Sequence, residues 1–566
     1  MWWRGAVLVA VALGSATAPS SSDPAARVQS ADVIARSWEV PAWRSRTRTG
    51  LSPKTRALAQ RICGSAPRVE IENPCLRRVG RSCAATAMDP FFTALDGLAK
   101  VEAQRPVVIA AFGNSLIAGD RIVDRIRARF GERFGDGGRS VLLIDRQASY
   151  GPRSRTGIRS SGWEPRTLGE LAPLPHPVGL SGVYHRAERK GARARFRLRG
   201  EHSGTLWWWD GPSRAPISVH IDGRMVARTE PQGSGAGVAT RFRIPPRART
   251  LEVVAEKKGA LTHGLVLEQR SFGVVVDSFG VPSADATLWL RADETIFSEQ
   301  LAERAPRLVM VVLGGNEAKR LQWHRTHLSR VEKSLRAFIR RVTDVPSAPA
   351  CLVVGPIDAV LGPDAEDPFE ERPWLRRVNA LERKVALSEG CAWFDFYEAM
   401  GGRGALHRLY GLGLVHDDLV HPRGRGLDLL GELVADALLR AYARAPLRGD
   451  ESEVAAAWRA LVAAPGGVEG SARTTARRIR VALERRDEFV DGLLRGLAEA
   501  EALASSWDRD VVLLDDAEAR AAVEALFEDA ATRAVLDARG WRDPDGELTR
   551  RAGLGLAALL AAGAVE

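Results

Sequence analysis

Five apolar segments lie along the chain, and apolar residues at helical spacing follow several of them. The first, PVVIAAF at 106–112, precedes Ile117, Ile122, Ile126 and Phe130 at near-helical intervals. The other four segments lie at 273–278, 307–315, 351–356 and 391–396, and helical patterns lie around 317–342, 373–388 and 424–443. Continuous apolar strands alternating with amphipathic helices are typical of a parallel sheet covered on both faces. The pattern therefore predicts an α/β fold with a five-stranded parallel sheet.

A region of different character separates the first of these segments from the second. Short runs such as ARARFRLRG, ISVHIDGRMVA and TLEVVAE alternate between polar and apolar residues, with Gly, Pro and Asp-Gly between them. Alternation of period two with such punctuation is typical of antiparallel strands. We predict that 151–270 form an inserted β-sandwich, which divides the α/β domain into a first part, 101–150, and a second part, 271–445.

The two ends of the chain lie outside these domains. MWWR, an apolar stretch and ATA at 16–18 form the pattern of an export signal over 1–18, whose cleavage or retention as an anchor is left open. Residues 19–100 begin as a Ser-, Ala-, Pro- and Arg-rich tether and continue with short helical patterns. The Ala-, Arg-, Glu- and Leu-rich composition of 446–566 predicts a helical C-terminal region. No apolar stretch is long enough for a bilayer, so we expect an exported protein, periplasmic or extracellular, without a membrane span after signal removal.

Composition adds limits to this picture. With 566 residues, 45% hydrophobic and 27% charged, the chain is globular and long enough for several domains. The net charge of +11 is dispersed without a dense basic run, so we expect no nucleic-acid binding. Attraction to anionic envelope polymers and a merely solvated basic surface both fit this charge. The sequence does not indicate an oligomeric state.

Five cysteines suit an oxidising compartment. Cys75 and Cys83 are close enough in sequence to close a small disulfide loop within a loop-like segment. Cys351 and Cys391 each open an apolar run, and we expect them to be small buried residues. Cys63 has no predicted disulfide partner, and no spacing of Cys and His residues suggests a zinc site.

Polar residues follow the carboxyl ends of the predicted strands. They are Ser115 in AFGNSL, Gly280 and Ser283 in DSFGVPSADA, Asn316 in VVLGGNEA, and Asp418 and His421 in HDDLVHP. Open parallel sheets bind ligands beyond these strand ends, so the residues are expected at one edge. A serine nucleophile needs a base within hydrogen-bond reach and a third group that fixes the tautomer of the base. Ser115, His421 and Asp418 fit these roles.

The remaining groups can stabilise the negative oxygen that develops during acyl transfer. Asn316 offers a side-chain amide, and the Ser115 N–H and an N–H near Gly280 to Ser283 are further donors. Each feature also has a structural alternative. Ser115 can cap a helix, Asn316 can cap the helix that begins after it, and Asp418 with His421 can be a loop pair. His416, Asp418 and His421 lack a fourth metal ligand, and we expect neither a metal nor an organic cofactor.

The stretches GNSL, GVPSA, GGNEA and DLVHP, in this order, resemble the four blocks of the SGNH (GDSL-type) hydrolases. The resemblance covers about 105–150 and 271–445 and is greatest to exported bacterial members with an inserted carbohydrate-binding-like β-domain, such as peptidoglycan O-acetylesterases. It implies a three-layer sandwich, with Ser115, His421 and Asp418 as the triad. Two positions depart from the family pattern. Asn114 stands where Asp is usual before the nucleophile, and Ser283 stands at the oxyanion glycine, with Gly280 as the fallback donor.

Three consecutive tryptophans, Trp207 to Trp209, are the other notable feature. In a strand Trp208 points to one face and its neighbours to the other, so core packing is the first interpretation and glycan contact by Trp208 the second. The sequence as a whole predicts an exported serine esterase that removes O-acetyl or similar acyl groups from peptidoglycan or another acylated polysaccharide. The alternatives are a glycan-binding envelope protein on a weakened hydrolase scaffold and an acyltransferase.

Overall fold

A computed structural model describes residues 9–11, 42–63, 67–79, 82–99, 105–145, 159–170, 172–269, 273–446 and 511–513. The chain divides into two compact units. One unit comprises Met1–Arg46, Cys75–Thr86 and Ala443–Glu566, and the other comprises Thr47–Pro74 and Ala87–Tyr442. Among the helices that the structure describes, none has the length and hydropathy that a membrane crossing requires.

The first unit contains two described strand pairs. β1 (Val9–Val11) pairs antiparallel with β21 (Val511–Leu513). The rest of the predicted export signal, most of the predicted tether and the rest of the predicted C-terminal helical region lie outside the described residues. The described part of 19–100 begins with α2 (Ala42–Ser45). β3 (Cys75–Val79) and β4 (Ser82–Thr86) form a hairpin closed by a Cys75–Cys83 disulfide. The pairing of these cysteines is confirmed, but the segment is a hairpin and not the expected loop.

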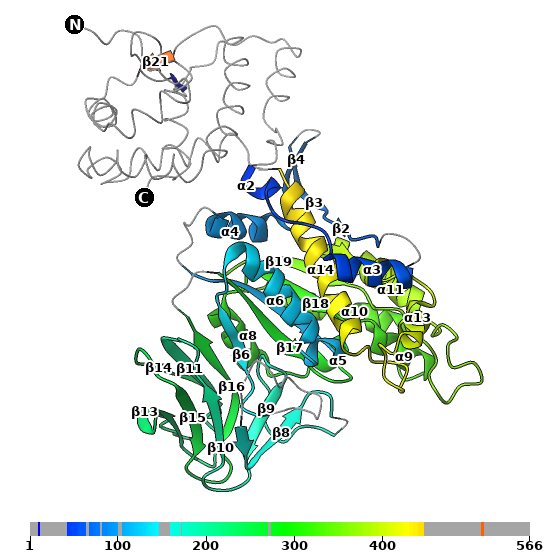
Figure 1. The fold of residues 1–566 in the computed structure, drawn as a ribbon. Coiled ribbons are helices and arrows are strands. Elements are labelled where there is room, and N and C mark those ends of the chain that lie inside the picture. Colours follow the sequence, from blue (N-terminus) through cyan, green and yellow to red (C-terminus); the bar gives the residue numbers. More distant parts are fainter. Residues whose placement is uncertain are drawn as a thin grey trace, which may run out of the picture. The chain divides into compact units, whose positions relative to one another are not determined.

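The second unit is built on a mixed sheet of order β17-β5-β18-β19-β20-β2 (Figure 1). Its strands are β17 (Val274–Gly280), β5 (Val107–Gly113), β18 (Leu308–Val312), β19 (Ala350–Val354), β20 (Ala392–Phe394) and β2 (Ile71–Glu72). The first five pair in parallel, and β5, β18 and β19 are buried along their whole length. These are the five predicted strands. The two-residue β2 adds an antiparallel edge that the sequence pattern did not predict.

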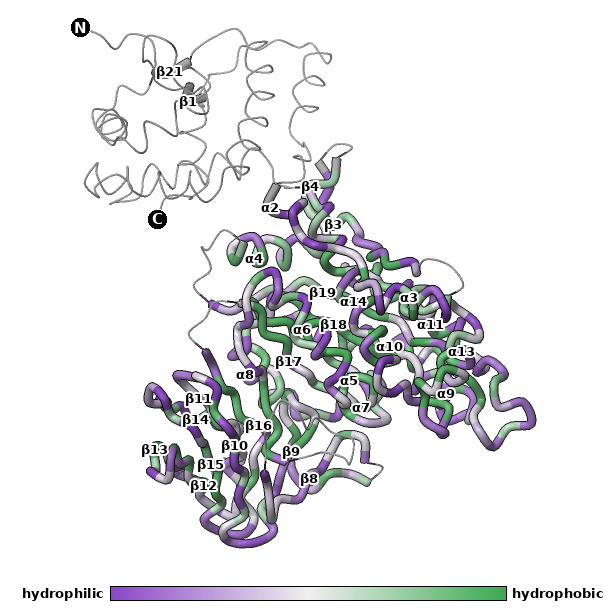
Figure 2. The backbone as a smooth tube through the Cα atoms, viewed as in Figure 1, coloured by the Kyte–Doolittle hydropathy of each residue, from purple (hydrophilic) through white to green (hydrophobic). Residues whose placement is uncertain are grey.

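Helices cover both faces of this sheet. On one face, Phe112 packs against aromatic rings of α7 (Ala286–Trp289), α8 (Glu294–Arg304) and α10 (Leu328–Thr343). On the other face are α4 (Asp89–Ala99), α6 (Arg121–Phe134) and α14 (Arg425–Arg444). Phe91 packs against Phe130, and Tyr442 packs against Phe92 and Phe134. Figure 2 shows the apolar central strands flanked by more hydrophilic outer segments. The predicted three-layer arrangement is therefore observed around the central sheet.

Smaller helices complete the α/β domain. They are α3 (Pro53–Cys63), α5 (Ser115–Ala118), α9 (Gly315–Gln322), α11 (Leu375–Ser388), α12 (Phe396–Ala399) and α13 (Ala405–Gly411). The helical pattern expected around 317–342 is two helices, because α9 ends at Gln322 and α10 begins at Leu328. His324, in the connection, has φ +53°, which a continuous α-helix cannot contain.

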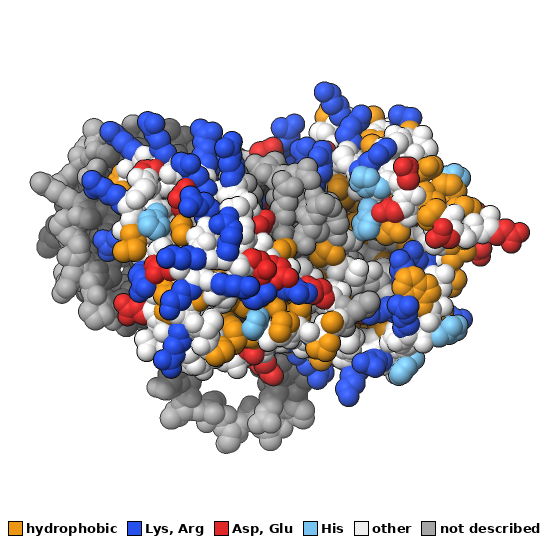
Figure 3. All heavy atoms as spheres, turned by 90° about the horizontal axis from the view of Figure 1, so that it is seen from below, with side chains coloured by type: hydrophobic (Ala, Val, Ile, Leu, Met, Phe, Trp, Pro, Cys, Tyr) orange, Lys and Arg blue, Asp and Glu red, His pale blue; other side chains and the backbone are white. Residues whose placement is uncertain are grey.

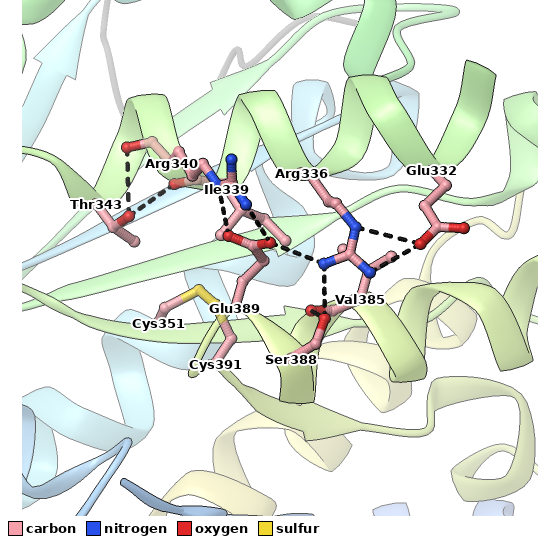
Figure 4. Close-up of polar contacts among 10 residues, drawn as sticks. All are labelled: Glu332, Arg336, Ile339, Arg340, Thr343, Cys351, Val385, Ser388, Glu389 and Cys391. Atoms are coloured by element: carbon pink, nitrogen blue, oxygen red, sulfur yellow. Dashed lines mark hydrogen bonds and ion pairs between the residues drawn. A yellow bond between two sulfur atoms is a disulfide. The ribbon is translucent and has the colours of Figure 1, made fainter. Parts of the chain in front are cut away.

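The expectation that Cys351 and Cys391 are isolated buried thiols is wrong. Both are buried, and they form a disulfide with a Cα–Cα distance of 4.6 Å. The reason is the topology, since β19 and β20 are parallel neighbours and bring Cys351 beside Cys391. Ion pairs also connect this segment to α10. Arg336 and Arg340 of α10 both pair with Glu389, at 2.8 and 2.7 Å (Figure 4). Cys63 is the free cysteine of the described residues.

The insert folds into two antiparallel sheets, as its alternating pattern predicts. One has the order β13-β12-β15-β10-β7 and the other β14-β11-β16-β9-β8, with β6 also pairing with β16. Their bounds are β6 (Gly138–Leu142), β7 (Arg159–Ser161), β8 (Trp163–Thr167), β9 (Val183–Ala187), β10 (Arg193–Arg197), β11 (Ser203–Trp209), β12 (Ile217–Ile221), β13 (Arg224–Arg228), β14 (Gly237–Arg243), β15 (Thr250–Ala255) and β16 (Leu261–Glu268). Because β6 begins at Gly138, the sandwich takes a strand from ahead of the expected boundary at residue 151.

Candidate functional site at the carboxyl edge of the sheet

Ser115 is the first residue of α5 and follows directly after β5 and Asn114. The Asn114 side chain accepts a hydrogen bond from the Leu116 N–H at 3.0 Å and so caps the helix. The capping role therefore belongs to Asn114 and not to Ser115, which leaves the Ser115 hydroxyl for another partner. An amide oxygen accepts this bond as a carboxylate would, so the Asn114 departure preserves the local geometry.

The hydroxyl of Ser115 meets His421, and His421 meets Asp418. Ser115 Oγ lies 2.8 Å from His421 Nε2, and His421 Nδ1 lies 2.7 Å from Asp418 Oδ2. The other carboxylate oxygen, Asp418 Oδ1, accepts the backbone N–H groups of Val420 and His421. A bridge between Val415 and Pro422 closes the loop that carries both side chains. The sequence placed these residues on one loop, and the structure brings them to the serine.

The pKa of Asp418 reflects this arrangement. Partial burial works to raise the pKa, but the hydrogen bonds from the His421 side chain and from the two backbone N–H groups outweigh it. The pKa of Asp418 is consequently lowered, and the carboxylate is ionised at neutral pH. An ionised acceptor at Nδ1 fixes the tautomer of His421 that leaves Nε2 free to accept the serine proton.

Asn316 lies in the first turn of α9, whose N-cap is Gly314. Its Nδ2 donates one hydrogen bond to the Ala284 carbonyl at 2.8 Å, and the amide carries a second N–H. A side chain added at the neighbouring Gly315 would meet no atom within 4 Å, so the loop borders open space. Asn316 is therefore not a helix cap, and it connects the β18–α9 loop to the loop that contains Ser283.

Ser283 is exposed and has φ +61°, a left-handed conformation that glycine adopts at less cost. Arg320 binds this loop, with Nη2 donating to the Ser283 carbonyl at 3.3 Å and Nε pairing with Asp285 at 2.8 Å. Among the described residues no acceptor faces the Ser283 N–H. The backbone thus keeps the conformation of a glycine despite the serine side chain, and its N–H is available to a ligand.

Gly280 has a different role from the one expected of a fallback donor. It is buried at the end of β17, and a Cβ there would lie 2.0 Å from the Ala118 nitrogen. Glycine at this position therefore lets α5, which carries Ser115, pack directly on β17. The structure supports a packing role for Gly280, and Ser283 is the better placed N–H donor of the two.

Two buried carboxyl groups beneath the site were not identified from the sequence. Glu317 Oε2 accepts the Gly314 N–H at 2.8 Å and Oε1 accepts the Ala286 N–H at 3.2 Å, so one carboxyl holds both loops of the site. Burial, and then the charge of Asp285, raises the pKa of Glu317 to about 8. Glu382 of α11 is also buried, and burial together with the charge of Glu317 raises its pKa. The G-x-x-E spacing of a capping box was the available signal for Glu317.

The tryptophan run alternates between two cores, and Trp208 is not a glycan ligand. Trp208 is 3% exposed, packs in the core of the sandwich and donates its indole N–H to Thr240. Trp207 points the other way, and its indole N–H donates to Glu303 of α8. The expected alternation is therefore confirmed, while glycan contact by Trp208 is excluded because its ring is inside the protein.

The described residues contain no group of three or more His, Cys, Asp or Glu side chains arranged to hold a metal ion. His416, the third member of the possible metal set with Asp418 and His421, has an exposed side chain, and its backbone N–H donates to the His421 carbonyl. Asp418 and His421 are engaged with each other and with Ser115.

A serine, a histidine and an aspartate in series at the carboxyl edge of a three-layer α/β domain define a serine-hydrolase arrangement. Comparisons with known proteins agree with this class. Residues 258–429 match the GDSL-like Lipase/Acylhydrolase family. A search of curated protein sequences found no match.

One of the similar solved structures has the same fold, and two others match shorter parts of the chain. A peptidoglycan O-acetylesterase is similar with a TM-score of 0.53 and 21% identity, over 63% of this chain and 97% of that chain. An acetylxylan esterase from Geobacillus stearothermophilus has a TM-score of 0.23 and 20% identity, over 30% of this chain and 73% of that chain. A family 35 carbohydrate binding module from Clostridium thermocellum matches 19% of this chain and 88% of its own, with a TM-score of 0.16 and 9% identity.

The matched range contains three of the four blocks that resemble the SGNH (GDSL-type) hydrolases, namely GVPSA, GGNEA and DLVHP, so it supports this family for that part of the chain. The match also supports an ester-hydrolysing activity.

Proposed function

We propose that the protein is an exported serine esterase that removes O-acetyl groups from a cell-wall or other polysaccharide. The observation that carries the proposal is the hydrogen-bonded series from Ser115 Oγ to His421 Nε2 and from His421 Nδ1 to Asp418, at 2.8 and 2.7 Å. Ser115 comes from one segment of the chain and Asp418 and His421 from another, and each group has the partner that acyl transfer requires.

In the proposed reaction, Ser115 Oγ attacks the ester carbonyl and its proton passes to His421 Nε2. Asp418 stabilises the imidazolium that forms. The tetrahedral oxyanion is stabilised by the second N–H of the Asn316 amide and by the backbone N–H groups of Ser115 and Ser283. The leaving sugar oxygen takes the proton from His421, and Ser115 remains acylated. Water, deprotonated by His421, then releases the carboxylic acid and restores Ser115.

Two kinds of observation support the substrate and the location. The structural relative of similar fold is a peptidoglycan O-acetylesterase, and the net charge of +11 suits an anionic envelope polymer. The N-terminal pattern of an export signal and the disulfides Cys75–Cys83 and Cys351–Cys391 support a location in an oxidising compartment.

The test uses purified full-length protein and a chromogenic acetyl ester, followed by acetate release from O-acetylated peptidoglycan and from acetylated xylan. Ser115→Ala removes the nucleophile, and Ser213→Ala is the matched control because Ser213 is an exposed serine on a loop of the sandwich. We expect Ser115→Ala to lose activity on all three substrates and Ser213→Ala to retain it. Equal rates for wild type and Ser115→Ala would contradict the proposal and favour a glycan-binding protein. Acetyl transfer to an added sugar acceptor in preference to water would favour an acyltransferase.

A further inference from the structure

Helix α9 leads from the site to an exposed tryptophan. Asn316, Lys319, Arg320 and Trp323 are spaced at i, i+3, i+4 and i+7, so they lie along one face of the helix. Seven residues at the helical rise span about 10 Å. Trp323, the C-cap of α9, is 47% exposed, in contrast to the buried Trp207 and Trp208.

Two cations lie over the Trp323 ring. Lys319 Nζ is 4.7 Å from the ring centroid, and the Arg325 guanidinium carbon is 4.8 Å from it. Within the described part of the chain neither cation forms an ion pair with a carboxylate, whereas their neighbour Arg320 is paired with Asp285. The ring therefore holds two positive charges that no acidic side chain neutralises.

The surrounding segment has one sign of charge. Every ionisable side chain in 318–331 is basic, namely Lys319, Arg320, His324, Arg325, His327 and Arg330. Figure 3 looks onto the side of the molecule on which α5 and α9 are drawn in Figure 1, and on this face basic side chains outnumber the acidic ones that lie among them. Such a surface attracts anions and disfavours cationic ligands.

Lys319 is also electrostatically connected with the triad. Burial lowers the pKa of Lys319, the charge of Arg372 lowers it further, and the charge of Asp418 acts in the opposite direction. The Lys319 ammonium group is therefore near enough to the triad for the Asp418 charge to act on it. The face of α9 that carries Lys319 and Arg320 thus extends from Asn316, at the site, to the exposed Trp323.

We propose that Trp323, Lys319 and Arg325 form a subsite for a carboxylate-bearing sugar unit of the substrate glycan, about 10 Å along α9 from Asn316. The indole face takes the apolar C–H surface of a sugar ring. Exposed cation–π contacts are weak, so Lys319 and Arg325 can turn from the ring to the carboxylate. This inference rests on the proposed function and adds that the polysaccharide is acidic.

The test measures binding, so it does not depend on turnover. Full-length Ser115→Ala protein is titrated calorimetrically with oligogalacturonate and with the same oligosaccharide after its carboxylates are converted to methylamides. We expect the carboxylate form to bind about tenfold more tightly, the effect of one well-placed charge pair. Arg325→Gln and Trp323→Ala should remove most of this difference, and Arg325→Lys should restore much of it. Arg193→Gln, on an exposed arginine of β10 in the sandwich, is the matched control and should retain the difference.

Several results would overturn the proposal that Trp323, Lys319 and Arg325 form a carboxylate-binding subsite. They are equal affinity for the two oligosaccharides, no measurable binding of the carboxylate form, and an equal loss from Arg193→Gln and Arg325→Gln. Failure of the proposed function is seen separately, as equal hydrolysis of the chromogenic ester by wild type and Ser115→Ala. The folded state of each variant is checked by its thermal unfolding, so that a loss of binding is not a loss of structure.

Discussion

The carboxyl edge of the parallel sheet and the inserted β-sandwich use their polar side chains differently. At the edge, the series that begins at Ser115 ends at Asp418, whose side chain is 46% exposed. In the sandwich, the indole N–H groups of Trp207, Trp208 and Trp209 all donate to acceptors within the protein, Glu303, Thr240 and the Gly235 carbonyl. Because an indole has a single N–H donor and each of these donors is used within the protein, none of them is available to a substrate. The difference assigns the chemistry to the sheet edge and a packing role to the tryptophans.

The largest effect is expected at the edge. His421→Ala removes the base and should lower kcat roughly 10⁶-fold, as losses of one member of such a unit do in other serine hydrolases. Because the members act together, the double variant with Ser115→Ala should lose little more than either single variant. The kcat for hydrolysis of the chromogenic acetyl ester is measured for His421→Ala, Ser115→Ala and the double variant. An additive loss in the double variant would mean that the two residues act independently.

In the sandwich a comparable truncation should affect stability and not chemistry. Trp208→Ala leaves a cavity in the core and should lower the free energy of unfolding by about 3–5 kcal/mol. The kcat of the folded variant should stay close to wild type. Trp209→Ala, on a partly exposed neighbour in the same strand, is the control and should cost less. Urea unfolding provides the measurement. Unchanged stability with weaker glycan binding would reverse the assignment of Trp208.

Substitution of Asn316 tests whether its side-chain amide stabilises the oxyanion in the transition state. Asn316→Ala removes one donor and should lower kcat about 10²- to 10³-fold with little change in KM, because the donor acts mainly in the transition state. It also removes the hydrogen bond to Ala284, so thermal unfolding is recorded beside the kinetics. A large rise in KM at constant kcat would instead indicate that Asn316 binds the ground state.

The buried carboxyl groups of Glu317 and Glu382 should make the stability of the folded protein depend on pH. The pKa of Glu317 is raised from 4.5 to about 8, and that of Glu382 is also raised. The folded protein therefore holds protons that the unfolded chain releases, so stability falls as pH rises from about 4.5 to about 8. Glu382→Gln removes one of these carboxyls and its repulsion of Glu317, and should flatten the decline. Glu366→Gln, at an exposed site, should leave it unchanged in urea titrations across this range. An unaltered decline in Glu382→Gln would show that these groups do not titrate as described.

The smallest effect is expected at Ser283. Glycine adopts the +61° φ of this position without the steric cost of a Cβ, so Ser283→Gly should stabilise the protein by about 0.5 kcal/mol. We expect a modest rise in kcat, because the N–H keeps its place and the approach to it is less hindered. Loss of activity in Ser283→Gly would mean that the hydroxyl takes part in the site.

The sequence was sufficient for features that depend on chain order. The five apolar strands and the polar residues after them were predicted, because parallel strands must present their carboxyl ends at one edge. The role of Trp208, in core packing or in glycan contact, could not be decided from the sequence. Alternation of residues along a strand shows which side chains share a face, but not which face is covered by the rest of the protein. The Cys351–Cys391 disulfide and the Glu317–Glu382 pair require the order of strands and helices in space, which periodicity does not contain. The two-residue β2 is too short to give a pattern.

In the proposed mechanism Ser115 is the activated nucleophile of the site. The most direct measurement is labelling of the full-length protein with a fluorophosphonate, followed by peptide mapping in the mass spectrometer. We expect one modified residue, Ser115, and loss of the modification in His421→Ala. Modification of a different serine, or none at Ser115 while the wild type hydrolyses acetyl esters, would contradict it.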